Sequence, residues 1–121
     1  MFPDQDFHTQ LRNKMDTYAH LVYTTTKRFP KDEIYGITSQ LRRSALSVSL
    51  NYVEGYARMR NKVQRNFIEI SYGSLQESKY LIEFSYKEKY MLLSEYKLLF
   101  LLADDIGKML WGMLRKMPHE S

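Results

Sequence analysis

The sequence contains no cysteine, and it has only five glycines and three prolines among 121 residues. The absence of cysteine excludes disulfide bonds and every metal site built on thiolates. The scarcity of glycine and proline removes most turn signals, so long uninterrupted elements are expected. The most apolar run, residues 98–103, is far shorter than the roughly 20 residues that a membrane-spanning helix needs. Because residues 1–6 are also polar and acidic, unlike a secretory signal, we predict a soluble cytoplasmic protein with no membrane partner.

The apolar residues recur at steps of three and four, the period of amphipathic helices. This pattern predicts four helices, at about residues 6–27, 31–58, 62–89 and 94–116. Pro30 separates the first two, because a residue before proline is pushed out of helical geometry. A chain of this length forms one domain, here residues 1–121. The predicted fold is all-α: an antiparallel up-down four-helix bundle.

The expected core faces differ between the four segments. In the second, Asp32 and Glu33 favour the positive end of a helix that begins after Pro30, and its apolar stripe starts at Ile34. The fourth is expected to begin at the N-cap Ser94, with the main stripe Leu98, Leu102, Ile106, Met109 and Met113. The third carries two apolar stripes, so we expect it to be buried on two sides. A second buried side predicts contact with another subunit, and ten tyrosines favour the same conclusion.

Positive charge is concentrated in the middle of the chain. Residues 27–65 hold nine basic residues and three acidic ones, a surplus of six that exceeds the net charge of +4 for the whole chain. The candidates for contact with nucleic-acid phosphates are Arg42, Arg43, Arg58, Arg60, Lys62 and Arg65. Such contacts give salt-dependent affinity without base readout. The alternative is a solvated face whose cations favour a helix carboxyl end.

Asn51 and Glu54 share one face of the second predicted helix, and Arg58 follows Glu54 by one turn. A carboxylate beside an amide can serve acid–base chemistry, but a glutamate with arginine four residues later forms an ordinary helical ion pair. Buried polar groups also need partners. We therefore interpret Asn51 and Glu54 as a structural polar network that holds neighbouring helices in register.

Residue patterns typical of enzymes are missing. No serine has a recognisable nucleophile context, and no glycine-rich phosphate loop is present. A di-iron bundle needs Glu-x-x-His motifs on two helices, but no glutamate lies three positions before His8, His20 or His119. The sequence therefore predicts a non-enzymatic protein with no catalytic residue, no metal and no cofactor. The tyrosines are interpreted as core, rim or subunit contacts in preference to base-stacking surfaces.

One set of residues carries a family resemblance. It comprises Phe29-Pro30, Glu33, Tyr35-Gly36, Gln40, Arg42-Arg43, Ser47, Asn51, Glu54-Gly55, Arg58, Gly73-Ser74-Leu75 and Glu77. With its Arg-Arg pair and Asn-x-x-Glu-Gly-x-x-Arg core, this set resembles the four helix bundle protein family. That family includes proteins encoded by intervening sequences of bacterial 23S ribosomal RNA genes, and it is related to the accessory variability determinant of diversity-generating retroelements.

The resemblance implies a small helical bundle that assembles into a homopentamer. It further implies a basic surface presented to RNA or DNA, or to a reverse transcriptase. A ribosomal component is a further candidate partner. Ser49 stands where the family often has proline, so a kink in the second helix is not expected. The alternative function is a structural or protein-binding adaptor with no direct affinity for nucleic acid.

Overall fold

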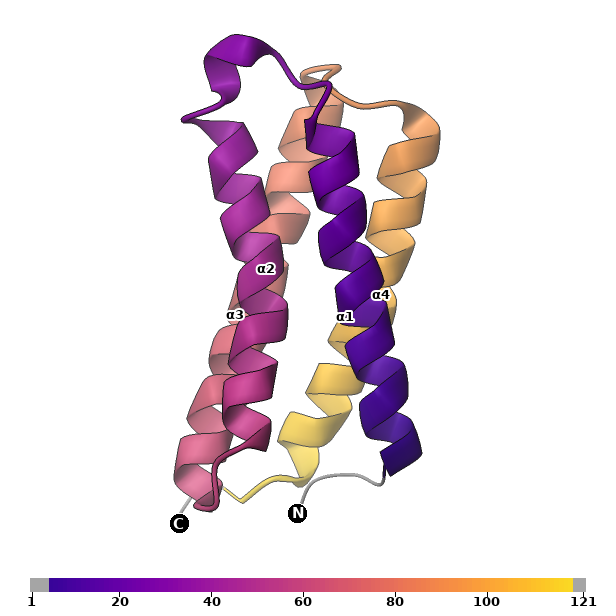
Figure 1. Cartoon of the computed structure of the whole chain (residues 1–121). Helices are drawn as coiled ribbons and strands as arrows, with labels where there is room; N and C mark the ends of the chain where they lie inside the picture. Colours follow the sequence, from indigo (N-terminus) through magenta and orange to yellow (C-terminus); the bar gives the residue numbers. More distant parts are fainter. Residues whose placement is uncertain (1–4, 119–121) are drawn as a thin grey trace.

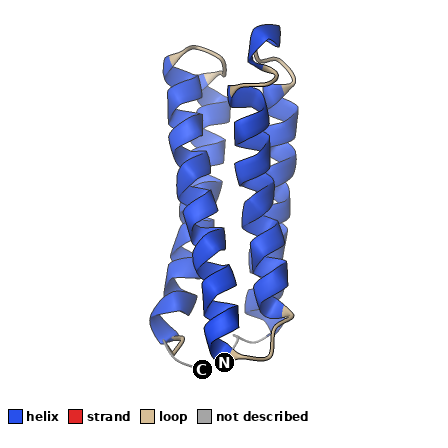
Figure 2. Ribbon diagram, turned by 90° about the vertical axis from the view of Figure 1, so that its left-hand side faces the viewer, coloured by secondary structure: helices blue, strands red, loops and turns tan. Residues whose placement is uncertain are grey.

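The computed structural model describes residues 5–118, which form four long helices and one short turn of 3-10 helix. The helices are α1 (Gln5–Thr26), α2 (Ile37–Tyr56), α3 (Asn61–Lys87) and α4 (Leu93–Lys116), and the turn is η1 (Lys31–Glu33). Consecutive helices run in opposite directions (Figure 1), and residues 5–118 contain no strand (Figure 2). The predicted all-α four-helix bundle is therefore confirmed. Within the described part of the chain, no helix combines the length and the hydrophobicity that a membrane span requires.

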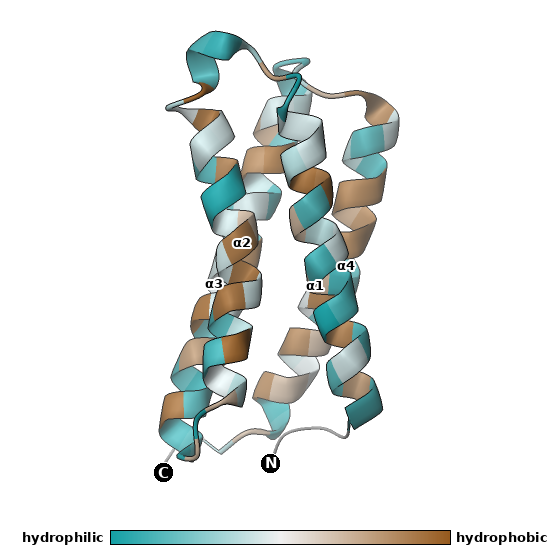
Figure 3. Ribbon diagram, in the orientation of Figure 1, coloured by the Kyte–Doolittle hydropathy of each residue, from teal (hydrophilic) through white to brown (hydrophobic). Residues whose placement is uncertain are grey.

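The helices surround a single core in cyclic order. Each packs against the helix before and after it, and α1 closes the ring against α4. Figure 3 shows hydrophobic residues recurring between hydrophilic ones along every helix. One row of side chains from each helix fills the interior, and its fully buried members include Leu11, Val22, Leu41, Val48, Ile68, Leu75, Ile82, Leu99, Ile106 and Leu110. Tyr18 is also buried, and its hydroxyl shares a hydrogen bond with Ser78 at 2.6 Å, so its polar atom has a partner inside the bundle.

The most extensive helix contact is that of α2 with α3, and small residues line it. A β-carbon placed on Gly55 would lie 3.0 Å from Cδ1 of Ile68 and 3.1 Å from Cβ of Phe67. The Ser71 hydroxyl donates to the Val48 carbonyl at 2.7 Å across the same contact. The α2 helix is continuous through Ser49, as expected for a chain without the family's proline.

The start of α2 lies six residues later than predicted. Residues 31–33 form η1, and Ile34 is 54% exposed and outside the core stripe. The backbone of Gly36 is non-helical, and the helix begins at Ile37, whose N–H donates to Oε1 of Glu33 at 3.2 Å. Glu33 thus satisfies an amide at the start of α2 from outside the helix, a capping role that the expected continuous helix would not require.

The start and the buried face of α4 also differ from the prediction. Leu92 is the N-cap in place of Ser94, and Oε1 of Glu95 accepts the Leu92 N–H at 2.8 Å. The buried row is Leu99, Ala103, Ile106, Leu110, Met113 and Leu114, whereas Leu98 is 47% exposed. The apolar arc of α4 is wider than the core requires, and the positions of α1 and α3 decide which part of it is buried.

Both apolar sides of α3 find partners within the same subunit. On one side Phe67 meets Gly55 and the Arg58 guanidinium, whose carbon is 5.1 Å from the ring centroid. On the other, Tyr72 lies 5.9 Å from Trp111 between ring centroids. These members of the two stripes are therefore covered within the subunit, whereas Ile70 of the first stripe is 50% exposed. Ile70, Tyr80 and Phe84 stay exposed on the outer face of α3.

Candidate nucleic-acid interface

The six predicted phosphate-binding residues fall at two ends of the bundle. Arg42 and Arg43 lie in the second turn of α2, whereas Arg58 lies two residues beyond its last residue, Tyr56. Sixteen residues of helical rise separate Arg42 from Arg58, about 24 Å. Arg60 and Lys62 flank the start of α3, and Arg65 lies in its second turn. The six residues therefore do not form one continuous patch.

Arg42 contributes to the packing of α1 against α2. Its Nε donates to the Thr26 hydroxyl at 2.8 Å, and its guanidinium carbon lies 4.8 Å from the centre of the Tyr23 ring. Arg43 is exposed and lines a polar groove between α2 and α3 with Glu77. This pair of arginines is thus divided between a helix contact and a surface position.

Arg65 holds the end of α4 against the start of α3. Its Nη1 donates to the carbonyls of Leu114 at 2.8 Å and Met117 at 3.1 Å, and its Nε donates to Glu69 at 3.1 Å. Its side chain is only 14% exposed. Cationic side chains near a helix carboxyl end satisfy carbonyls that have no intrahelical partner. Most of the hydrogen-bonding capacity of Arg65 is therefore used inside the subunit.

The Arg65 contacts bring the last turn of α4 beside the connection between α2 and α3, and both segments lie at the bottom of Figure 1. This adds two exposed cations that the sequence analysis missed, Arg115 and Lys116. They lie about fifty residues from the other cations, and basic residues in a last helical turn are common because they favour the helix dipole. Only the tertiary contact identifies them as neighbours of the α2–α3 connection.

We call Arg58, Arg60, Lys62, Arg115 and Lys116 the basic end. All five are exposed. Arg58 pairs with Glu54 at 2.6 Å, and within residues 5–118 no carboxylate lies at ion-pair distance from the other four. The start of α3 adds a further positive contribution, because Arg60 is its N-cap and supplies no side-chain cap. This end of the bundle therefore carries an excess of positive charge.

Asn51 and Glu54 occupy different environments. The Asn51 amide donates to the Ser47 carbonyl at 2.9 Å and to the Ser47 hydroxyl at 2.8 Å. The Ser47 hydroxyl shares a hydrogen bond with Ser74 at 2.9 Å, which links α2 to α3. Glu54 is exposed and pairs with Arg58, so it does not join Asn51 in the network between helices.

The bundle also buries a histidine near the first turn of α1. His8 is 6% exposed, its Nδ1 lies 3.0 Å from the Tyr52 hydroxyl, and its ring stacks on Tyr56 with centroids 3.8 Å apart. Burial lowers the pKa of His8, and the Arg12 charge lowers this pKa further. Burial also raises the pKa of the Tyr52 hydroxyl. Within residues 5–118 no three metal-binding side chains converge, and His119 lies outside the described residues.

Comparison with known proteins bears on both the fold and the family. The family model described as 23S rRNA-intervening sequence protein matches residues 8–112. A crystal structure of a protein of unknown function from the S23 ribosomal protein family of Bacteroides thetaiotaomicron is similar, with a TM-score of 0.81 and 18% sequence identity. The similarity covers 88% of this chain and 99% of that one. Among curated proteins, none matches the sequence.

Proposed function

The chain belongs to the 23S rRNA-intervening sequence protein family, and we propose that it is a non-enzymatic, homo-oligomeric protein that binds RNA or DNA through the phosphate backbone. The proposed contact surface is the basic end, with Arg60, Lys62, Arg115 and Lys116 as the principal cations. Arg43 is a candidate for an additional contact along α2. Arg42 and Arg65 are proposed to support the surface by holding the helices in place.

The observation that carries this proposal is the convergence of two distant segments at one end of the bundle. Residues 58–62 and residues 115–116 are joined there through Arg65, and their combined charge is offset mainly by Glu54. Lysine and arginine side chains that neutralise phosphates release condensed counterions, so binding is tight at low salt and weakens steeply as salt is added. Contacts of this kind position a nucleic acid without reading its sequence.

Charge reversal at the basic end tests the proposal. The double variant Arg60→Glu with Lys62→Glu changes two exposed side chains that lie outside the helix contacts. We expect it to bind structured RNA and duplex DNA more weakly than the unmodified protein, because two cations are replaced by two repelling carboxylates. Affinity is measured at several salt concentrations, and each lost contact should reduce the slope of log K against log salt by about 0.7 to 0.9.

The matched control is Lys27→Glu with Lys31→Glu, two exposed cations at the opposite end of the bundle. The control should retain the affinity and the salt slope of the unmodified protein. Absence of binding at low salt, or equal losses in both double variants, would contradict the proposed interface.

Self-association is supported by apolar side chains that the subunit leaves exposed. On α2 these are Leu46, Leu50 and Val53, which recur at helical spacing on one outer face, and on α3 they are Ile70 and Phe84. Exposed apolar patches of this kind mark interaction surfaces. The number five comes from the family resemblance. In such a ring the basic end is repeated in every subunit, and multivalency raises the affinity for a long nucleic acid.

The second candidate function is a protein-binding adaptor, and the end of the bundle opposite the basic end favours it. Tyr35 is 94% exposed there, with Ile34 at 54% and Leu92 at 61%. A reverse transcriptase and a ribosomal component are the proposed partner classes. This candidate predicts that a partner co-purifies after nuclease treatment and is lost in Tyr35→Ala, with no direct RNA affinity of the purified protein.

A further inference from the structure

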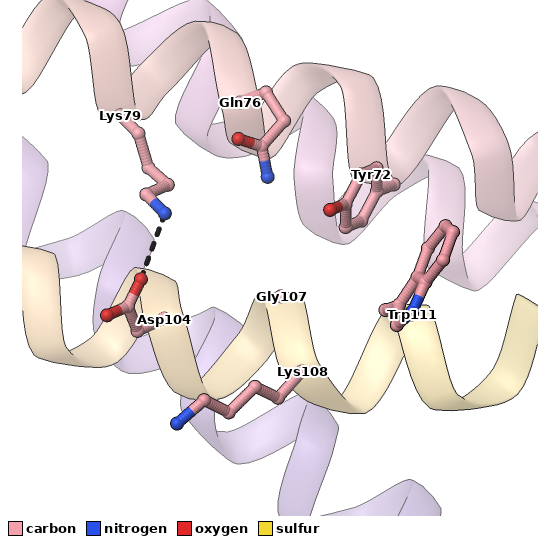
Figure 4. Close-up of a pocket in the computed structure, with 7 residues that line it drawn as sticks. All are labelled: Tyr72, Gln76, Lys79, Asp104, Gly107, Lys108 and Trp111. Atoms are coloured by element: carbon pink, nitrogen blue, oxygen red, sulfur yellow. Dashed lines mark hydrogen bonds and ion pairs between the residues drawn. The ribbon is translucent and has the colours of Figure 1, made fainter.

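A groove of about 250 Å³ lies between α3 and α4, on the side of the bundle where these two helices face solvent. Figure 4 shows Tyr72 and Gln76 reaching into it from α3, Trp111 closing one end, and the Lys79–Asp104 pair closing the other. Gly107 forms the floor, where a β-carbon would come within 3.3 Å of Cδ2 of Leu75. A larger residue at this position would narrow the groove and press on the Leu75 side chain.

The aromatic end of the groove presents a ring surface to solvent. Trp111 is 53% exposed, although tryptophan is usually well buried. Its ring centroid lies 5.9 Å from that of Tyr72, with the planes inclined by 38°. The contact with Tyr72 supports the indole from one side. Exposed, supported aromatic rings of this kind are the platforms on which unpaired bases stack.

The charges around the groove favour an anionic ligand. Asp104 is neutralised by Lys79 at 2.9 Å, and Lys79 is further held over the Phe100 ring at 5.0 Å. Lys108 lines the same groove and has no carboxylate at ion-pair distance within residues 5–118. Glu69, two turns before Gln76 on α3, is paired with Arg65. The net contribution of these groups is positive.

The groove is continuous with the basic end. Trp111 and Arg115 are four residues apart on α4, so they share one helix face and are separated by about 6 Å along its axis. Tyr72 follows Arg65 by two turns on α3. A strand whose phosphates contact Arg115 and the other cations of the basic end therefore reaches the Trp111 ring within a short distance.

We propose that the α3–α4 groove binds an unpaired nucleotide of single-stranded RNA or DNA, with its base stacked on Trp111 and the neighbouring phosphates held by Lys108 and Arg115. This inference rests on the proposed function and narrows it to single-stranded nucleic acid. A duplex keeps its base faces stacked inside the helix, so it can use the basic end but not the indole surface. The groove thereby gives a preference for unpaired segments without sequence readout.

Trp111 is the only tryptophan in the chain, so its fluorescence reports directly on the groove. The full-length protein is titrated at low salt with an oligouridylate and, separately, with a duplex of equal length. Saturable quenching by the oligouridylate is expected, with little quenching by the duplex. Trp111→Ala should weaken oligouridylate binding by about tenfold, in the range of one lost base–aromatic stack, and should leave duplex binding unchanged.

Tyr80→Ala is the matched control, because Tyr80 is a 64% exposed aromatic residue of α3 that does not line the groove. It should retain full affinity for the oligouridylate, and Trp111→Phe should retain most of it. Unquenched fluorescence at saturation, while charge reversal at the basic end still weakens binding, overturns the groove assignment and leaves the proposed function standing. A changed oligomer mass in Trp111→Ala with unchanged oligouridylate affinity also overturns it, and identifies the groove as a subunit contact. Failure of both nucleic acids to bind removes both proposals.

Discussion

Among the individual residues, the buried His8 makes the stability of the bundle depend on pH. Its pKa in the folded protein is lowered from 6.5 by burial and by Arg12, so the unfolded chain takes up a proton more readily. The contribution of neutral His8 to the free energy of unfolding is therefore fully present above about pH 6.5. It is lost as the pH decreases below that value. If the His8 ring were protonated in the folded protein, its charge would lie near that of Arg12. Both ring nitrogens would then be donors, so the Tyr52 hydroxyl would have to accept the hydrogen bond from Nδ1.

We expect the melting temperature of the unmodified protein to fall between pH 7 and pH 5, and this dependence to be reduced in His8→Gln. His20→Gln serves as the control, because His20 is exposed and pairs only with the exposed Asp16. Thermal unfolding followed by circular dichroism across this pH range measures the melting temperature of the unmodified protein and of both variants. An equal pH dependence in His8→Gln and in the unmodified protein would show that other groups cause it.

Gly55 is a second residue whose surroundings fix its identity. Alanine at this position would place its β-carbon 3.1 Å from Cβ of Phe67 and 3.2 Å from the Gln64 carbonyl, atoms that can move only with the backbone of α3. Overpacking of this kind costs about 1 to 3 kcal/mol. Gly73→Ala is the control, since nothing lies within 4 Å of its β-carbon and helix propensity favours alanine by about 1 kcal/mol. Chemical denaturation should show a loss of stability for Gly55→Ala, where overpacking outweighs the same gain in helix propensity, and a gain for Gly73→Ala.

Between the helices, Arg65 determines how firmly α4 is held at its carboxyl end. Arg65→Met keeps an apolar stem of similar length but removes the donors to Leu114 and Met117. We expect a loss of about 1.5 to 3 kcal/mol for hydrogen bonds made by a charged group, and faster amide exchange at residues 110–117. Lys62→Met, which changes an exposed cation three residues earlier on α3, should change neither quantity. Equal amide exchange rates at the end of α4 in Arg65→Met and Lys62→Met would mean that the apolar packing of α4 alone holds this end in place.

At the scale of the whole molecule, the proposed self-association and the proposed nucleic-acid binding are expected to be coupled. Leu50→Glu places a charge on the exposed apolar face of α2, where Leu50 is 57% exposed, and should dissociate the oligomer. Loss of multivalency should then weaken binding of a long RNA far more than binding of an oligonucleotide that spans one subunit. Thr17→Glu, at an exposed position of α1, is the control. Solution mass and titration with both RNA lengths measure the effect, and a monodisperse monomer of the unmodified protein at micromolar concentration would contradict it.

The helical periods, the scarcity of turn residues and Pro30 were sufficient to predict an all-α four-helix bundle with nearly correct helix ends. These signals are local, because amphipathic period and backbone restriction act within a few residues. The start of α2 is an exception, and it involves one contact within four residues and one across a much larger separation. The start of α2 depends on Glu33 accepting the Ile37 amide, and Tyr90 of the loop after α3 donates to the same carboxylate at 3.0 Å.

For the charged surface too, some features follow from the sequence and others only from the packing of the helices. Residue order alone was enough to predict that the chain is basic around residues 58–65 and that its helices carry more apolar surface than one core row needs. The packing of the helices was required to show that Arg65 holds α4, that Arg115 and Lys116 join the basic end, and that Trp111 meets Tyr72 at a groove. This difference arises because a sequence pattern gives the face of each helix, whereas the neighbours of that face are chosen by all four helices together.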